Sequence, residues 1–558
     1  MLPYLCNGGI GPQWWWFSII LYNIPQIMCL KLLYFIRVTY TLLFVATFNN
    51  MSSIDPNSFV NLSYSLTSLS LLGCHLREKF PDNIFKLPNI EYLSLDENPK
   101  LTGQFPKSNW SSPLVVLSAF GTSLSGELPE SFGDLKSLTG LALLFSNFFG
   151  SIPRSLGNLS QLEFLYLSHN YFTSKIPSSL ANLAKLRILA LGHNQLEGCI
   201  PNNPNAFRNL RYLDLFDDLL SGTTPSWLYT IPLLRYLNLG NNQFNGHISE
   251  FQNRLLITII LKDNSFRGPI PSSISKLVNL TFLDLSSNFI EGDLPKLPPN
   301  IRFLSVSYNN LTENFLRICI SKFLEILSLS HNKFSGVIPQ CIGSFSKNLS
   351  SLNLKMNKLH GTIPSTFAQG CALKNMNLNS NHLEGPLTPS ITNCKDLQVL
   401  DVGNNMINDS FPNWIEAFSE LQVLVLRSNK FHGPITAPTS SGSLPKLRIV
   451  DLSCNNLFGP LLTGYIKNFK GMINILDDGQ GIQKDVGELS SLRGLNLSHN
   501  NLVGHIPTSL RNMTRLEWLD LSSNKLSGQI PTGLLDLTFL SFFNVSYNQL
   551  VGRILHGN

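Results

Sequence analysis

Apolar residues recur in a fixed pattern along most of the chain, in the phrase L-x-x-L-x-L-x-x-N-x-L-x-G-x-I-P. One copy places Leu162, Leu165 and Leu167 before Asn170 and ends at Pro177, and the next copy begins 24 residues later. A fixed period of this length is typical of solenoids, in which each repeat packs only against its neighbours. The pattern therefore makes a binding surface a better hypothesis than an active site.

The asparagine of the phrase marks the register of the repeats, and we call its place the Asn position. It falls at 20 places, namely 74, 98, 122, 146, 170, 194, 218, 242, 264, 288, 309, 332, 357, 381, 405, 429, 455, 500, 524 and 548. Four of them hold another residue: Cys74, Thr122, Ser146 and Asp218. Each of these side chains can still hydrogen-bond, the thiol only weakly.

The x-L-x-L-x segment of each repeat predicts a short strand whose leucines point inward and whose other residues point outward. Stacking buries the leucines in one continuous core and aligns the strands as a parallel sheet. The Asn side chain is expected to be buried and paired with backbone groups, because unpaired buried polar groups are costly. The sequence predicts an α/β-type solenoid, a horseshoe or superhelix of about 20 repeats with a parallel β-sheet on its concave face.

The phrase L-x-G-x-I-P resembles the plant-type leucine-rich repeat over residues 65–555. Four segments resemble more closely the kinase-less plant receptor-like proteins, the group that includes the Cf-type tomato resistance proteins; they are residues 370–405, 427–435, 444–455 and 465–472. In that family the last segment opens a non-repeat island a few repeats before the end. The family's cysteine-bearing N-terminal cap, C-terminal cap, acidic stretch, membrane helix and basic tail are not recognised, so the resemblance implies a truncated or degenerate product.

The expected organisation has five parts. Residues 1–50 form a hydrophobic leader, either a signal peptide or a signal-anchor, unless they derive from a wrongly assigned first exon. Residues 51–64 are a degenerate N-terminal cap region, residues 65–462 hold repeats 1–17, residues 463–489 are a remnant of the island, and residues 490–558 hold repeats 18–20.

Charge and sequon content favour the secretory pathway over a nucleic-acid partner. The net charge of +6 is spread along the chain with no Lys/Arg block, which argues against nucleic-acid binding. Nine N-x-[ST] sequons are predicted glycosylation sites: Asn50, Asn61, Asn109, Asn158, Asn279, Asn310, Asn348, Asn408 and Asn512. Asn496 and Asn544 lie on the strand face and are interpreted as chance sequons.

Two cysteine pairs fall at near-equal offsets in adjacent repeats. Cys319 and Cys341 lie 10 and 9 residues after their Asn positions, and Cys371 and Cys394 lie 14 and 13 after theirs. Neighbouring repeats stand ~5 Å apart, a distance that suits a disulfide. Two sets of buried free thiols are the alternative interpretation.

Sequence signatures of enzymes are absent: there is no kinase H-R-D or D-F-G, no Walker loop, no H-E-x-x-H and no C-x-x-C. Four histidines directly precede an Asn position, namely His169, His193, His331 and His499. They are interpreted as solvated surface rather than as metal ligands. We therefore expect no enzyme and no cofactor.

The predicted ligand-binding residues lie on the concave face. Most of them stand four or two residues before the Asn position, and two of them, Phe145 and Asp217, stand directly before it. They are aromatic, bulky or charged where most repeats have small residues, and such residues dominate binding hot spots. They are Phe120, Leu144, Phe145, Tyr166, Asp214, Phe216, Asp217, Lys262, Lys355 and Arg427. Irregular local packing is the alternative interpretation.

The resemblance implies an extracellular recognition protein at the plasma membrane or in the apoplast. It would bind a peptide or protein and signal in defence or development through a partner receptor kinase, with a membrane attachment only through the leader or a missing C-terminal helix. The family contacts its co-receptor at the positions held here by Asn496, Ser498, His499, Asp520, Ser522 and Ser523. The alternatives are a secreted inhibitor of a cell-wall-degrading enzyme, similar to polygalacturonase inhibitors, and a non-functional receptor fragment.

Overall fold

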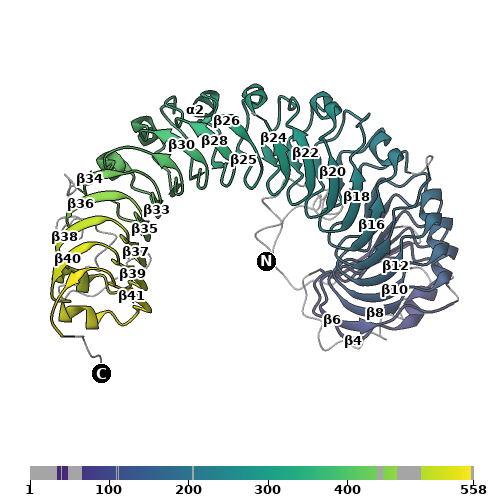
Figure 1. Cartoon of the computed structure of the whole chain (residues 1–558). Helices are drawn as coiled ribbons and strands as arrows, with labels where there is room; N and C mark the ends of the chain where they lie inside the picture. Colours follow the sequence, from purple (N-terminus) through teal and green to yellow (C-terminus); the bar gives the residue numbers. More distant parts are fainter. Residues whose placement is uncertain are drawn as a thin grey trace.

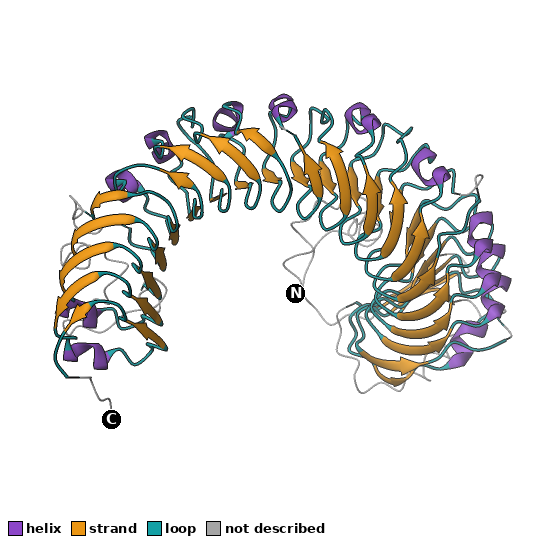
Figure 2. Ribbon diagram, viewed as in Figure 1, coloured by secondary structure: helices purple, strands orange, loops and turns teal. Residues whose placement is uncertain are grey.

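The computed structural model shows one continuous arch of stacked repeats (Figure 1). It describes residues 34–38, 41–47, 66–108, 110, 112–203, 207–313, 315–435, 444–461 and 492–553. Strands line the inside of the arch and helical turns stand on its outside (Figure 2). The predicted fold, a solenoid with a parallel sheet on its concave face, is confirmed.

The concave sheet has 22 strands, and each of the 20 repeats contributes one of them. The strands are β1 (Tyr34–Val38), β2 (Thr41–Val45), β3 (Leu66–Ser70), β5 (Tyr92–Ser94), β7 (Val116–Ser118), β9 (Gly140–Ala142), β11 (Phe164–Tyr166), β13 (Ile188–Ala190), β15 (Tyr212–Asp214), β17 (Tyr236–Asn238), β19 (Thr258–Ile260), β21 (Phe282–Asp284), β23 (Phe303–Ser305), β25 (Ile326–Ser328), β27 (Ser351–Asn353), β29 (Asn375–Asn377), β31 (Val399–Asp401), β33 (Val423–Val425), β35 (Ile449–Asp451), β37 (Gly494–Asn496), β39 (Trp518–Asp520) and β41 (Phe542–Asn544). Equivalent residues pair across neighbouring repeats, as Leu165 does with Leu189. The inward leucines are fully buried and form one core that runs the length of the arch.

A second row of strands covers one side of the arch and is divided into three sheets of 11, 4 and 5 strands. The first holds β4 (Arg77–Lys79), β6 (Lys100–Gly103), β8 (Ser123–Glu127), β10 (Asn147–Ser151), β12 (Tyr171–Lys175), β14 (Gln195–Gly198), β16 (Leu219–Thr223), β18 (Gln243–His247), β20 (Ser265–Gly268), β22 (Phe289–Asp293) and β24 (Asn310–Thr312). The second holds β26 (Ser335–Val337), β28 (Lys358–Gly361), β30 (His382–Gly385) and β32 (Met406–Ile407). The third holds β34 (His432–Pro434), β36 (Asn456–Pro460), β38 (Asn501–His505), β40 (Lys525–Gly528) and β42 (Gln549–Leu550).

Short helices stand on the convex side. They are the 3₁₀ turns η3 (Asp82–Lys86), η4 (Glu130–Asp134), η5 (Arg154–Asn158), η6 (Ser178–Asn182), η7 (Ser226–Thr230), η8 (Ser272–Lys276), η9 (Leu316–Ile320), η10 (Pro389–Asn393), η11 (Asn413–Ala417), η14 (Thr508–Asn512) and η15 (Thr532–Asp536), and the α-helical turn α2 (Cys341–Phe345). Most follow the proline of the I-P phrase, as η5 follows Pro153. Proline fixes its own φ and has no N–H, so it is well suited to the start of a helical turn.

The Asn positions form a ladder of hydrogen bonds through the arch. Asn288 is buried, and its amide nitrogen donates to the carbonyls of Leu285 and of Leu261 in the preceding repeat at 3.2 and 3.0 Å. Its carbonyl oxygen accepts the backbone N–H of Phe266 at 3.0 Å. One side chain thus satisfies backbone groups of two repeats that would otherwise be buried without partners.

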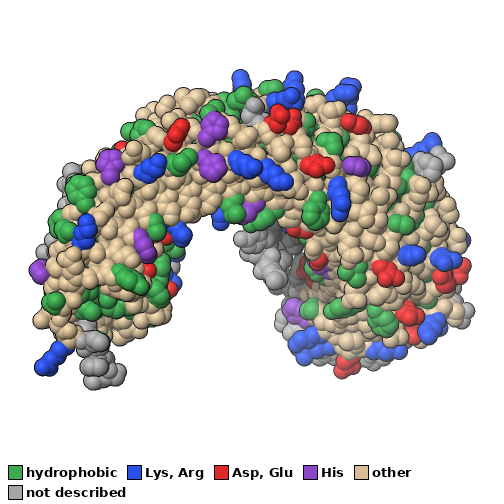
Figure 3. Space-filling view, in the orientation of Figure 1, with side chains coloured by type: hydrophobic (Ala, Val, Ile, Leu, Met, Phe, Trp, Pro, Cys, Tyr) green, Lys and Arg blue, Asp and Glu red, His purple; other side chains and the backbone are tan. Residues whose placement is uncertain are grey.

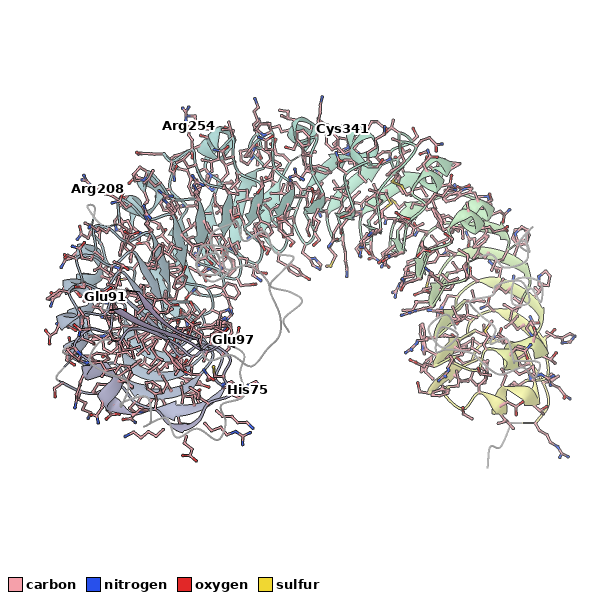
Figure 4. All side chains as sticks on the ribbon, turned by 180° about the vertical axis from the view of Figure 1, so that it is seen from behind. His75, Glu91, Glu97, Arg208, Arg254 and Cys341 are labelled. Carbon is pink, nitrogen blue, oxygen red and sulfur yellow. A yellow bond between two sulfur atoms is a disulfide. The ribbon has the colours of Figure 1, made fainter. Side chains whose placement is uncertain are left out.

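Two disulfides lie toward the convex side and link neighbouring repeats. Cys319 in η9 is bonded to Cys341 in α2, and Cys371 is bonded to Cys394. The first bond spans the place where the side row is interrupted between β24 and β26. These are the pairs named from the repeat offsets, and Figure 4 labels Cys341 on the outer edge of the arch.

The concave sheet begins inside the segment assigned to the leader. β1 and β2 pair antiparallel, and β2 adds to β3 in parallel. Phe44 and Ala46 are buried in the places of the two inward leucines, and the Cys74 thiol lies 2.6 Å from the Ala46 carbonyl, as an Asn position does with the repeat before it. An early degenerate repeat therefore covers the edge of repeat 1, whereas cleavage of a leader stays a prediction.

Several predicted features lie outside the described residues: the island remnant at 463–489, most of the leader, and the sequons at Asn50, Asn61 and Asn109. Within the described parts of the chain, no helix has the length and apolar character needed to span a bilayer.

Asp218 shows what the ladder requires of a substitute for asparagine. Its Oδ1 accepts the Leu196 N–H at 2.9 Å, as an asparagine would, but its buried Oδ2 has no hydrogen-bond partner among the described residues. Burial, and then the nearby Asp217 carboxylate, raise the pKa of Asp218 to about 8, although the Leu196 N–H acts in the opposite direction. At neutral pH the side chain is therefore largely a neutral acid, whose proton on Oδ2 can replace an asparagine N–H.

We predict that Asp218→Asn stabilises the protein increasingly as the pH rises from about 4 to about 8. The pKa of Asp218 is raised on folding, so its stabilising contribution is present at low pH and is lost as the pH rises through the folded value. The gain at pH 8.5 should be about 1–3 kcal/mol, the cost of an unsatisfied buried group. Urea unfolding at pH 4.5 and 8.5 measures it. The reverse change, Asn194→Asp, should create the same pH dependence, and a gain independent of pH would contradict the explanation.

Candidate ligand-binding surface

Five side chains stack into a ring ladder along the concave face between β7 and β15. The ladder consists of Phe120, Phe145, His169, His193 and Phe216. The ring centroids lie 5.7 Å apart from Phe120 to Phe145, 3.9 Å from Phe145 to His169, 3.9 Å from His169 to His193 and 5.1 Å from His193 to Phe216. The three central rings are nearly parallel, so five consecutive repeats present one continuous edge of rings.

Backbone geometry explains the placement of the ladder. The residue directly before the Asn position is left-handed in repeat after repeat, with φ of 54° at Phe145, 56° at His169 and 58° at His193. Histidine, asparagine and aspartate are enriched in this conformation, whereas a bulky ring is a genuine outlier there. Phe145 therefore keeps a strained backbone while its side chain stays 43% exposed. The repeat imposes the same φ on Tyr308 and Met356, so the backbone fixes where the ring stands and does not by itself mark a function.

Two acidic side chains, Asp214 and Asp217, lie beside the ladder near His193. The Asp217 carboxylate lies 2.8 Å from Nδ1 of His193 and accepts a hydrogen bond from the side chain of Asn241. Asp214 lies deeper, where its carboxylate accepts the Phe216 N–H at 3.1 Å and the Tyr212 hydroxyl at 3.1 Å. Burial raises the pKa of Asp214, against the effect of these donors and of His193. This part of the face is thus polar but internally paired.

The ladder is continued by a cation and bordered by stacked tyrosines. The Lys262 ammonium lies 5.4 Å from the Phe216 ring centroid, a cation–π distance. A Cβ on Gly240 would approach the Phe216 ring to 3.0 Å, so this glycine leaves room for the ring to lie across the face. Tyr212 and Tyr236 stack at 4.2 Å with an angle of 5° between their planes.

Six of the ten sequence-based residues belong to the ladder or lie beside it, and four do not. Phe120, Phe145 and Phe216 belong to the ladder, and Asp214, Asp217 and Lys262 contact it or lie beside it in the same repeats. Tyr166 is half-buried in β11, where burial raises the pKa of its hydroxyl to about 12, and Leu144 is buried. Lys355 and Arg427 lie several repeats away, and Arg427 is 3.8 Å from Asp451.

Half of the six residues assigned to a co-receptor contact are buried. Asn496, Ser498 and Ser522 are buried, and the Asp520 carboxylate accepts the N–H and hydroxyl of Ser522. His499 is exposed, and Asp520 and Ser523 are half-buried, so these three are the accessible members of the set.

The predicted glycosylation sites on the described chain lie away from the ring ladder. Asn158 and Asn512 end η5 and η14 on the convex side. The exposed sites are Asn158, Asn279, Asn348, Asn408 and Asn512, and Asn310 is half-buried. Asn496 is buried and Asn544 is half-buried, in keeping with chance sequons.

Sequence reasoning missed the two histidines at the centre of the ladder. His169 and His193 were interpreted as solvated filler, but both are half-buried and stacked. The available signal was the position directly before the Asn position, which holds Phe145, His169, His193 and Asp217 in four consecutive repeats. Charged side chains elsewhere are scattered over the visible surface with both signs interspersed (Figure 3).

Comparisons with known proteins support a receptor ectodomain. A family model described as "Leucine rich repeat" matches residues 481–550, and a second, "Leucine Rich Repeat", matches residues 161–183, 233–254, 279–301, 323–345 and 348–369. "Receptor like protein 27" of Arabidopsis thaliana is 32% identical over 299 residues, which cover 48% of this chain and 37% of that relative. The chain thus spans well under half the length of the curated relatives it matches.

Solved structures with the same architecture are ectodomains of plant receptor kinases. The ectodomain of the Arabidopsis receptor kinase HAESA, in complex with an N-terminally extended IDA peptide hormone, superposes with a TM-score of 0.79 and 31% identity, covering 90% of this chain and 81% of that one. HAESA in complex with IDA and the co-receptor SERK1 superposes with a TM-score of 0.76 and 31% identity, covering 88% and 79%.

We predict that the effect of His169→Phe on the urea midpoint of unfolding is more favourable at pH 5 than at pH 7.5, because any cost of a bulky residue at the left-handed backbone is the same at both pH values. Burial, and then the neighbouring His193, lower the pKa of His169 to about 4, although Asp217 acts in the opposite direction. The unfolded histidine takes up a proton near pH 6.5, so the folded state loses stability as the pH falls from about 6.5 to about 4. Phenylalanine keeps the stack but cannot be protonated. An equal effect at both pH values would show that His169 does not titrate in this way.

Proposed function

This chain belongs to the plant leucine-rich-repeat receptor-like proteins, and from that premise we propose that it binds an extended peptide along the concave face between β7 and β19. The ring ladder is the observation that carries the proposal. It runs across five neighbouring repeats and combines exposed apolar edges with the polar groups of His193, Asp217 and Lys262. Aromatic side chains of this kind supply most of the binding energy in protein and peptide interfaces.

The paired polar groups suit recognition of a peptide backbone. Because Asp217 is already bonded to His193 and Asn241, a ligand does not have to neutralise a bare carboxylate to lie there. Rigid, internally bonded side chains also lose little conformational freedom on binding, which improves affinity. Asn158 and Asn279, two exposed predicted glycosylation sites, are not among the residues of the ladder, so glycans there would not cover its rings.

We further propose that the ligand-bound chain acts through a partner receptor kinase, at the outer face of the plasma membrane or in the apoplast. The family and the HAESA–IDA–SERK1 complex support this proposal. His499, Asp520 and Ser523 are the side chains of the family's contact positions that are accessible for it.

The test selects displayed 12-residue random peptides on the purified full chain. Enriched peptides should bind the Phe145→Ala/Phe216→Ala variant at least ~10-fold more weakly, because truncation of an aromatic hot spot costs at least about 2 kcal/mol. Phe149→Ala is the matched control, since Phe149 lies in the same repeat as Phe145 and is 46% exposed on the side row. Thermal unfolding confirms that each variant is folded. Failure to enrich any peptide, or equal losses in both variants, would refute the proposal.

A further inference from the structure

Three arginines occupy equivalent places in consecutive repeats, at the start of β13, β15 and β17. Arg187, Arg211 and Arg235 each stand seven residues before their Asn position. The Arg211 N–H donates to the Arg187 carbonyl at 2.8 Å, and the Arg235 N–H donates to the Arg211 carbonyl at 2.8 Å. The backbone thus stacks the three residues at the spacing of neighbouring strands, ~4.8 Å. We call them the arginine column.

In two other repeats an arginine at this position is neutralised by the next repeat. Arg302 pairs with Glu325 at 2.5 Å and Arg493 pairs with Glu517 at 3.1 Å, each one repeat away at the same place. In the column only Arg187 has such a partner, Glu163 at 3.0 Å on the preceding repeat. Arg211 and Arg235 take part in none of the ion pairs, side-chain hydrogen bonds or cation–π contacts of the described residues.

Adjacent like charges on neighbouring strands are destabilising, so an unneutralised column costs stability in the free protein. Arg235 is exposed and Arg211 is half-buried, which leaves both guanidinium groups accessible. Two neighbouring guanidinium groups match the planar oxygens of a carboxylate, sulfate or phosphate, which arginine binds through paired hydrogen bonds.

The arginine column lies next to two stacked tyrosines at the edge of the proposed peptide site. The next residues along the strands are Tyr212 and Tyr236, whose rings stack on each other. The Tyr212 hydroxyl donates to Asp214, and the Asn238 side chain donates to the Tyr236 hydroxyl at 3.3 Å, so both tyrosines are fixed. Asp217 lies at the far end of the same strand region, paired with His193.

The column and the ring ladder occupy opposite edges of the same strands. In repeat 2, Glu91 stands at the position of the column arginines and Glu97 at the position directly before the Asn position. Figure 4 labels these two residues at opposite ends of one strand region. Repeat 6 contributes Arg187 to the column and His193 to the ladder. Repeat 7 contributes Arg211 to the column, and Phe216 and Asp217 to the opposite edge. A peptide that lies across these repeats can therefore touch both.

We infer that Arg211 and Arg235 bind an anionic group of the peptide ligand, a side-chain or terminal carboxylate or an esterified sulfate or phosphate. This inference rests on the proposed function, because it names the chemistry of the ligand at that same face. Charge complementarity carries it: the column presents two uncompensated positive charges beside a binding surface whose acids are already paired or buried.

The test uses the 12-residue peptides that are enriched on the full chain and depend on Phe145 and Phe216. We expect them to carry an acidic group, and we expect Arg211→Gln/Arg235→Gln to weaken their binding at least ~10-fold, the effect of losing hydrogen bonds to a charged group. Arg211→Lys/Arg235→Lys should retain part of the affinity. Lys374→Gln is the matched control, because Lys374 is exposed at the same place in a distant repeat.

Synthetic versions of one enriched peptide distinguish the sources of the anion. Loss of binding on C-terminal amidation identifies a terminal carboxylate, whereas loss on Asp→Asn or Glu→Gln replacement identifies a side chain. A phosphotyrosine or sulfotyrosine in place of the acid should bind at least as well. Raising NaCl from about 0.05 to about 0.5 M should weaken binding to the wild-type chain more than to the arginine variant, because salt screens exposed charges.

The outcomes separate the two proposals. Peptides that require Phe145 and Phe216 but lack acidic groups, or that bind the arginine variant with unchanged affinity, overturn the anion site and leave the peptide-binding face intact. If no peptide depends on Phe145 and Phe216, the peptide-binding face is wrong and the anion site falls with it.

Discussion

The hydrogen bonds of the Asn positions are the constraint on which the rest of the arch depends. The asparagines join a repeat to its predecessor through their side-chain amides, as Asn288 does with Leu261 and Phe266. They hold every repeat in the same register, and so equivalent outward residues come into columns at strand spacing. Both proposed binding features are such columns, the ring ladder at one edge of the concave sheet and the arginine column at the other.

Asp218 illustrates how narrow this constraint is. A carboxylate has no N–H to donate, and the buried position responds by raising the pKa of Asp218 until the acid holds a proton. The substitution lies directly next to Asp217 and close to Phe216, where the surface departs most from the usual small residues. The repeat with this unusual surface therefore also has a core position that a carboxylate fits poorly.

The period of 24 residues was sufficient to predict the solenoid, its concave sheet and the number of repeats, because each repeat has the same simple burial pattern. It did not predict the ring ladder as a unit. The residues of a column are 24 apart in sequence, and single positions such as His169 look like ordinary surface histidines. The arginine column escaped notice for the same reason: Arg211 is unremarkable until Arg187 and Arg235 are placed beside it. Residues 34–45 were assigned to the leader on composition alone, which does not reveal that Phe44 and Ala46 continue the repeat.

The two interruptions of the side row are held together by different bonds. The concave sheet is continuous, whereas the side row breaks between β24 and β26 and again between β32 and β34. Backbone hydrogen bonds still cross each break, from Ser335 to Glu313 at the first and from His432 to Asp409 at the second. The Cys319–Cys341 bond adds a covalent tie at the first break, and the second has no disulfide among the described residues. The first joint is therefore sensitive to reduction, whereas the second is held by non-covalent contacts alone.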